Sequence, residues 1–310
     1  MIQEEIWQTD IKEALFADHL FMNKCVNVSA SVVGGRAVHI PQAGRPSGVK
    51  IDRGLFPAAV TQREDSDIIY KLNEFTSNPI RVSNLETIQV SYDKRASIMR
   101  QDLLRLEEAY SLKQLANWAA LGSDNNVVLK TTGEARDTFV AGTTGKRKAF
   151  TVKDLLRISE AMKKQKLGKM TGKMNAMVTP EMVTDITLDP MFIDNPAWMS
   201  SWVSTGTLPK IAGFEFVEYP DSTIYKADLS VFRNYNSDCE LTGVQATDCA
   251  SAFFWHSDCV EGAVGDVLVF ERIKDPLYYG DIFDFLVMAG GRKNRADGKG
   301  VFALVQEVTA

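Results

Sequence analysis

Residues 92–121 read YDKRASIMRQDLLRLEEAYSLKQLANWAAL, and this stretch decides how the rest of the chain is interpreted. Apolar side chains recur at intervals of three and four residues, and neither glycine nor proline interrupts them before Gly122. The periodic apolar positions are Ile98, Leu103, Leu104, Leu106, Tyr110, Leu115, Trp118 and Leu121. The spacing predicts one helix of about 28 residues and about 42 Å, which is unusually long for a compact enzyme domain. We therefore expect this helix to act as a structural spine.

The segment that precedes this helix has the pattern of an extended arm. Residues 41–57 (PQAGRPSGVKIDRGLFP) are too rich in proline and glycine to form a core element. Alternating apolar residues lie on both sides of a turn at 76–79, so residues 41–90 are predicted to form a long two-stranded arm. An isolated hairpin is marginally stable in water, and such an arm therefore needs a partner surface. Periodicity alone leaves an alternative open, in which the arm packs on its own domain.

Shorter elements are predicted nearer the N-terminus. Residues 1–22 carry the apolar stripe of an amphipathic helix. Residues 26–32 alternate between apolar and polar side chains, a Gly-Gly pair at 34–35 suits a tight turn, and residues 38–40 continue on the return strand. The sequence therefore predicts a helix followed by a small hairpin.

The second half of the chain alternates between helices and strands, which is typical of layered α/β units. A helix capped by Thr151 is predicted over residues 151–166, and Thr179-Pro180-Glu181 is predicted to begin another helix. Residues 122–150 predict a loop or small hairpin. Strands are predicted at 175–178, 214–217, 252–255, 267–270 and 283–288. At the C-terminal end, 281–289 and 301–308 are predicted to pair as a hairpin around the charged turn 290–300.

Composition limits the classes of function. The chain has 310 residues, a net charge of −5 and a pI near 5.4, which disfavours a tight, sequence-independent nucleic-acid binder. No apolar run approaches the ~18 residues of a membrane-spanning helix, so no membrane partner is expected. The early acidic residues of the segment 1–6 do not suit the basic region of a secretory signal.

Residues that carry catalysis or bind metals are scarce, with four Cys and three His in the whole chain. There is no C-x-x-C pair, and His256 alone lies close enough in sequence to Cys259 to complete a zinc set. We expect semi-buried thiols, with a metal site or disulfides, including disulfides between chains, as alternatives. The run 142–147 resembles a phosphate-binding loop but has the wrong glycine spacing. The sequence therefore predicts no enzyme, no catalytic residues, no cofactor and no metal, while a cytosolic carboxylate-dependent hydrolase remains an alternative.

Three groups of residues carry a family likeness. They are Tyr70–Thr76 with Pro79–Val82 and Ser91–Arg95, then Phe254–Val260, and finally Tyr278–Asp281 with Gly290–Lys293 and Arg295–Gly298. In this shared order they resemble the major capsid proteins of tailed bacteriophages. The resemblance covers residues 55–121 and 205–310 well, the first 54 residues loosely and residues 122–200 poorly.

The resemblance implies an α+β chain with the Hong Kong 97-type phage capsid fold, built from an N-arm, an extended β-hairpin loop, a long spine helix, a peripheral domain and an axial domain. The implied segments are the N-arm at 1–40, the extended loop at 41–91, the spine helix and a peripheral-domain segment at 92–149, the axial domain at 150–249 and the peripheral-domain return strands at 250–310.

The function implied by the resemblance is self-assembly into the icosahedral head that encloses the double-stranded DNA genome of a tailed phage. The expected partners are other copies of the chain in hexamers and pentamers, a portal, packaged DNA in non-specific contact and a decoration protein. Many family members carry a scaffolding segment before the N-arm, whereas here the N-arm begins at Met1, so we expect a separate scaffold protein or a mature product. The expected location is the virion, after synthesis in the host cytoplasm. An encapsulin-like bacterial nanocompartment, which shares the fold, is the nearest alternative.

Candidate inter-subunit contacts lie in the arm and in the charged turn. They are Phe56, Arg63, Glu64, Lys71, Glu74, Arg292, Lys293, Arg295 and Lys299. A second basic run, Lys163, Lys164, Lys166, Lys169 and Lys173, is either a solvated helix face followed by a loop or a patch for packaged nucleic acid or an acidic neighbour. The turn at 292–299 likewise carries either plain exposed charge or an inter-subunit salt-bridge site.

Overall fold

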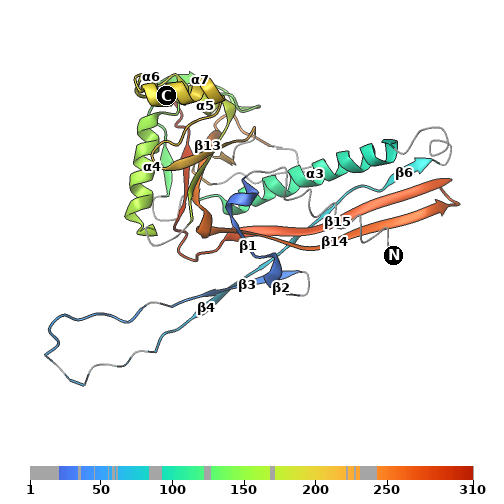
Figure 1. Ribbon diagram of the computed structural model, residues 1–310, viewed down its shortest axis with the longest axis horizontal. Coiled ribbons are helices and arrows are strands. Elements are labelled where there is room, and N and C mark those ends of the chain that lie inside the picture. Colours follow the sequence, from blue (N-terminus) through green and yellow to red (C-terminus); the bar gives the residue numbers. More distant parts are fainter. Residues whose placement is uncertain are drawn as a thin grey trace.

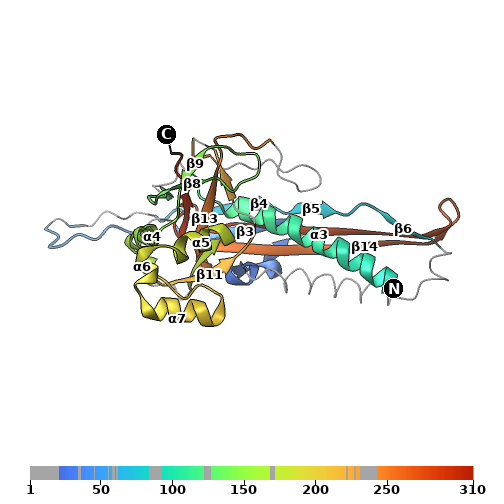
Figure 2. The same ribbon diagram turned by 90° about the horizontal axis from the view of Figure 1, so that it is seen from above.

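The described part of the chain has an elongated shape (Figure 1). The computed structural model describes residues 21–33, 36–44, 46–54, 56–57, 60, 62–83, 93–121, 127–167, 172–220, 223–226, 228–230 and 243–309. An α/β domain lies at the centre, and a long hairpin runs out from it beside a long helix. A thin arm points in the opposite direction, as both views show (Figures 1 and 2).

The predicted spine helix is confirmed as α3, Asp93–Trp118. Its C-terminal half buries Leu106, Tyr110, Leu115 and Trp118, which follow the predicted spacing. The indole of Trp118 donates a hydrogen bond to the backbone carbonyl of Glu261 at 3.0 Å, which fixes the end of the helix against the hairpin. Figure 2 shows the helix running alongside the hairpin towards its far end.

The long hairpin consists of β14, Val260–Asp275, and β15, Gly280–Lys293. Three short strands complete this sheet: β1 (Val26–Asn27) lies parallel to β14, and β5 (Asn73–Thr76) and β6 (Ile80–Ser83) pair with β15. The predicted pairing of 281–289 with 301–308 is therefore wrong, because residues 301–305 form β16, which pairs with β13 instead. Residues 290 and 291 are not in a turn but inside β15, where the absence of side chains makes room for Leu72 and Gln114.

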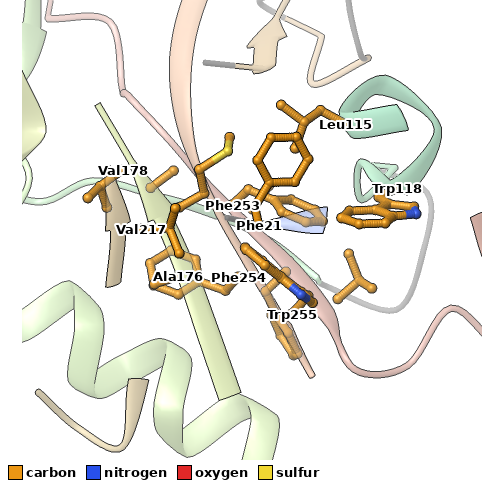
Figure 3. Close-up of a cluster of buried hydrophobic side chains, with 14 of the residues drawn as sticks. Phe21, Leu115, Trp118, Ala176, Val178, Val217, Phe253, Phe254 and Trp255 are labelled. Carbon is orange, nitrogen blue, oxygen red and sulfur yellow. The ribbon is translucent and has the colours of Figure 1, made fainter. Parts of the chain in front are cut away.

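A six-stranded sheet forms the core of the α/β domain, in the order β11-β10-β13-β16-β7 with β12 beside β13. These strands are β11 Phe214–Glu218, β10 Met174–Val178, β13 Cys249–His256, β16 Val301–Val305, β7 Val128–Lys130 and β12 Thr223–Tyr225. Every residue of β13 is buried, as expected for a central strand covered on both faces. On one face of β13, Trp255 packs on Trp118, which contacts Phe21, and Phe253 stacks beside Trp255 (Figure 3). On the other face, Phe254 packs on Phe150 and Phe214.

Helices flank this sheet: α4 Val152–Lys164, α5 Pro180–Thr187, α6 Pro190–Ile193 and α7 Pro196–Thr205. The predicted cap of α4 is confirmed, since the Thr151 hydroxyl oxygen accepts a hydrogen bond from the Asp154 amide at 3.3 Å. The start of α5 at Pro180 is confirmed as well. Between α3 and α4, β8 (Ala135–Asp137) and β9 (Lys146–Lys148) form the predicted small hairpin.

The arm is formed by β3, Ala37–Gln42, and β4, Ser66–Lys71, with the small strand β2, Val32–Val33, beside β3. Its two strands thus lie at 37–42 and 66–71. The predicted two-stranded arm over 41–90 is therefore too long at its C-terminal end. Residues 73–76 and 80–83 leave the arm and pair with β15, where Val82 is buried and Phe75 packs, half-buried, against the core.

The remaining N-terminal predictions have mixed outcomes. A 3₁₀ turn, η2 Ser29–Ser31, interrupts the predicted strand 26–32, and another, η1 Met22–Lys24, precedes it. The predicted helix over 1–22 falls outside the described residues, apart from its last two positions.

Candidate subunit interface

The loop at the end of the arm, residues 43–65, exposes apolar side chains to solvent. Val49 is 92% exposed, Ile51 88%, Phe56 77% and Val60 97%. Burial of such a side chain is worth about 1.5–3 kcal/mol, so leaving four exposed in one loop forgoes a large stabilisation. Exposed apolar side chains in this number are typical of surfaces that bind another molecule.

Local hydrogen bonds close the base of this loop. The Gly44 amide donates to Asp65 Oδ1 at 2.8 Å, and the Arg63 guanidinium donates to both carboxylate oxygens of Asp65 at 2.6 and 2.8 Å. These donors lower the pKa of Asp65 to about 2, with the Arg63 hydrogen bond as the largest cause. The structure therefore places Arg63, one of the predicted contact residues, in an ion pair within its own chain.

The other predicted contacts of the arm are exposed. Phe56 and Glu64 lie on the loop and Lys71 ends β4, and all three side chains face solvent. Glu74 lies beyond the arm, on β5, where its carboxylate is 4.0 Å from the Arg36 guanidinium. An exposed pair at this distance contributes at most about 1 kcal/mol, so Glu74 keeps its capacity for other partners.

The base of the arm packs on the β14–β15 hairpin. Tyr70 and Leu72 lie over Gly290, where an added Cβ would meet Leu72 at 3.1 Å and Tyr70 at 3.8 Å. Beside them, Glu261 is buried on β14 opposite Arg292 of β15. Burial raises the pKa of Glu261, while Tyr70 and the Arg292 charge act in the opposite direction. This packing sets the direction in which the arm leaves the domain.

The charged turn after β15 lies against the base of the arm. The Gln42 side chain at the end of β3 donates to the Asn294 carbonyl at 2.7 Å, and its amide oxygen accepts from the Ala296 amide at 3.4 Å. The structure thus joins the arm to the charged turn, which lies more than 200 positions away in sequence, through Gln42. No sequence signal marks Gln42, which sits in the Pro- and Gly-rich stretch.

Within the turn, Asp297 organises two of the predicted basic residues. Arg295 donates to its carboxylate at 2.9 and 2.8 Å, and Lys299 lies 3.3 Å from it. The Arg295 hydrogen bond holds the pKa of Asp297 far below its usual range. Arg292, near the end of β15, has an exposed side chain, and Lys293, the last residue of the strand, is half-buried.

The far end of the long hairpin is a second apolar surface, which the sequence analysis did not identify. Leu277 is 78% exposed and Tyr279 77%, and Tyr278, Phe270 and Ile273 are each about half exposed. The signal was present, because Leu-Tyr-Tyr at 277–279 is unusual for a solvated turn. It was overlooked because residues 281–289 were predicted to pair with 301–308, so that residues 277–279 were not expected at the tip of a hairpin.

Other features of the described residues bear on chemistry. No group of three or more His, Cys, Asp and Glu side chains gathers there in a way that could hold a metal ion. Cys25, Cys249 and Cys259 carry free thiols, and burial raises the pKa of Cys25 to about 12. None of the helices in this part of the chain has the length and apolar character needed to cross a membrane.

Comparisons with known proteins find the same architecture. No protein-family model matches the sequence, and no curated protein matches it either. Among solved structures, a chain from the capsid of cyanophage P-SCSP1u superposes with a TM-score of 0.61 at 14% identity, over 93% of this chain and 91% of that chain. A chain from Mycobacterium phage Che8 gives 0.59 at 14% identity, over 92% and 90%.

The chain has the Hong Kong 97-type capsid fold. The resemblance inferred from the sequence is thereby confirmed at the level of the fold. A chain of a virus-like particle from Pyrococcus furiosus has a similar structure, with a TM-score of 0.54 at 8% identity over 98% of this chain and 100% of that chain.

Proposed function

We propose that this protein is the major capsid protein of a tailed bacteriophage and assembles into the icosahedral shell that encloses double-stranded DNA. One observation carries the proposal: the arm holds an exposed apolar loop away from its own domain, in a chain whose fold is found in phage capsids. A monomer gains nothing from such a loop. A shell gains stability from it, because each copy can cover the loop of the next copy in a heterologous contact.

Many weak contacts per copy suit this role. The loop, the charged turn and the hairpin end offer separate surfaces, and several such contacts held at once give a strong assembly. We assign Phe56, Glu64, Lys71 and Glu74 of the arm region and Arg292, Lys293, Arg295 and Lys299 of the turn to contacts between copies. Arg63 contributes indirectly, by shaping the loop through Asp65.

The proposed role is structural and not enzymatic. The partners are other copies in hexamers and pentamers, a portal, a separate scaffold protein, packaged DNA and a decoration protein. The location is the virion, with synthesis in the host cytoplasm. The net charge of −5 supports a container of this kind, since a strongly positive lining would hold DNA tightly and resist filling.

A compartment shell that houses proteins is the second candidate. It is favoured by the match to the Pyrococcus furiosus virus-like particle, which spans the whole of that chain. Particles isolated from the native source separate the two functions: nuclease-protected double-stranded DNA inside supports the phage head, whereas an enclosed protein cargo supports the compartment.

The experiment for shell formation compares the full chain with a variant in which residues 46–63 are replaced by a short glycine linker. The Gly44–Asp65 hydrogen bond shows that the ends of this deletion already lie together, so the fold can close without strain. We expect the full chain to form closed particles in negative-stain electron microscopy and the variant to remain as folded subunits or open assemblies. Particles of normal size from the variant would contradict the proposal.

A further inference from the structure

The side chain of Glu261 lies on the face of the long hairpin that is turned away from α3. Gly262 and Gly291 are paired across β14 and β15, and a Cβ on either would meet Gln114 of α3. Neighbouring residues of a strand point to opposite faces of the sheet. The side chains of Glu261 and Arg292, which are also paired, therefore share the opposite face.

The base of the arm covers Glu261 on this face. Tyr70 and Leu72 pack over Gly290, and Glu261 beside them is only 3% exposed. The backbone carbonyl of Glu261 accepts a hydrogen bond from the Trp118 indole of α3 at 3.0 Å. One residue thus contacts the arm through its side chain and the spine helix through its backbone, at the place where the arm crosses the hairpin (Figure 1).

This joint accommodates a charged carboxylate poorly. The Tyr70 hydroxyl interacts with the Glu261 carboxyl, yet Tyr70 Oη and Glu261 Oε1 are both buried and complete no hydrogen bond with any residue that the structure describes. The charge of Arg292 favours the ionised form, but its side chain is exposed to water, which weakens the attraction. A buried carboxylate without a full set of hydrogen bonds is costly, whereas a hydrated one is not. The ionised form therefore favours an arm that has moved off the hairpin.

The other titratable groups around the joint keep one charge state near neutral pH. Burial raises the pKa of Cys25 to about 12 and also raises the pKa values of Tyr70 and Tyr110, so these three groups stay neutral. Arg292 stays positive. Glu107 is buried as well, but it belongs to α3, on the other face of the sheet.

We infer that the ionisation of Glu261 controls how firmly the base of the arm is docked on the hairpin. The neutral carboxyl fits the buried joint and holds the arm in the orientation seen here. The carboxylate loosens the joint, because it gains water when the arm moves away.

The sign of the pH dependence follows from burial. Burial raises the pKa of Glu261 above its ordinary value of 4.5 while the arm is docked. Docking is therefore strongest below about pH 4.5 and weakens as pH rises through the higher pKa of the docked state. This device works within a single chain and does not depend on shell formation. In the proposed shell, a loosened joint would let the arms of different copies reach their neighbours at different angles.

Hydroxyl-radical footprinting of dissociated subunits tests the device, because it reports the solvent exposure of individual side chains. Tyr70 and Leu72 report the joint, and Tyr279, which is 77% exposed, serves as the internal reference. We expect labelling of Tyr70 and Leu72 in the wild type to be at least about twofold higher at pH 8 than at pH 5. In E261Q, which is neutral at both pH values, we expect no such rise.

Two controls make the result specific. E74Q removes the charge of an exposed carboxyl on β5 and should keep the pH dependence of the wild type. His39 lies 2.9 Å from Asp67 on the arm, and a histidine also ionises in this pH range. A pH dependence that arises from His39 would survive in E261Q.

The device is refuted if labelling of the joint in the wild type is equal at pH 5 and pH 8, or if its rise persists in E261Q. Y70F gives a second test for the case that E261Q does not fold. The Tyr70 hydroxyl favours the carboxylate of Glu261, so its removal should enlarge the rise in Leu72 labelling between pH 5 and pH 8. An unchanged rise in Y70F would also contradict the device. Neither result bears on shell formation, which is measured separately.

Discussion

At the scale of single residues, glycines decide how closely the elements of the long hairpin approach one another. Gly262 and Gly291 are paired across β14 and β15, and both face Gln114 of α3. A Cβ on Gly291 would lie 2.5 Å from Gln114 Cδ and 2.5 Å from the Glu261 carbonyl oxygen. The second of these atoms belongs to the backbone and cannot move aside. The spine helix can therefore lie this close to the sheet because residue 291 has no side chain.

We predict that Gly291→Ala lowers the free energy of unfolding by about 1–3 kcal/mol, because the added methyl group forces α3 and β14 apart. Denaturant unfolding of dissociated subunits measures the change. Gly48→Ala is the matched control, since a Cβ at residue 48 has no neighbour within 4 Å. Equal stability of the two variants would show that the close approach of Gln114 is not required.

The charge of a single residue, Glu215, also contributes to the stability of the fold. Its carboxylate is 2.6 Å from Lys210, 3.2 Å from Lys173 and 3.4 Å from Lys24. The hydrogen bond from Lys210, followed by that from Lys173, lowers its pKa from 4.5 to about 2. A carboxyl whose pKa is lowered by folding stabilises the folded state above its unfolded pKa. That stabilisation is lost as pH falls from about 4.5 towards about 2.

We therefore predict that Glu215→Gln is less stable than the wild type near neutral pH and that the difference shrinks as pH falls through this window. Unfolding curves of both proteins near pH 6 and near pH 3 provide the test. A stability difference that stays constant between these two pH values would mean that Glu215 acts through packing and not through its charge.

At the scale of elements, the arm is a short two-stranded ribbon with a long loop. β3 and β4 pair over six residues each, from Ala37–Lys71 to Gln42–Ser66. The loop between them has no strand among its described residues. Such a loop is held in one shape only when a second surface covers it.

We predict that V49S/I51S/V60S raises the protein concentration needed for assembly at least about a hundredfold, because three apolar side chains that become buried between copies are lost. Light scattering during assembly measures the effect. The variant V49I/I51V/V60I, which keeps apolar side chains at these positions, serves as the control and should assemble nearly normally. If the serine variant assembles as readily as this control, the loop is not a contact.

The sequence predicted those elements whose signals are local. The three- and four-residue spacing of α3 and the Thr151 cap of α4 depend on neighbours in the chain, and both were found. The partner of β15 was missed, because Gly290 and Gly291 looked like a turn and Leu277-Tyr278-Tyr279 did not. The reason for these glycines is the approach of Leu72 and Gln114, which only the tertiary structure shows.

The same distinction between local sequence signals and tertiary contacts applies to the residues of the candidate interface. The exposure of Phe56 follows from the Pro- and Gly-rich stretch 41–57 that contains it, and that of Glu64 and Lys71 follows from their charge. The internal ion pair of Arg63 and the anchoring role of Gln42 depend on contacts that spacing in the sequence does not encode.

At the scale of the whole molecule, the shape itself is informative. The arm and the long hairpin extend from opposite sides of the α/β domain (Figures 1 and 2), and both carry exposed apolar side chains. A molecule with two such projections gains contacts from several neighbours at once. The α/β domain has a well-buried core of its own and can fold before assembly. Folding therefore depends on the core, whereas assembly depends on the two projections.

The central claim is that the loop of the arm is covered by another copy of the chain. Cryo-electron microscopy of particles assembled from the purified wild-type protein tests it most directly. We expect closed shells in which Val49, Ile51 and Phe56 of one copy are buried against a neighbour. Shells in which this loop folds back onto its own domain, or protein that forms no closed shell under any assembly condition, would contradict it.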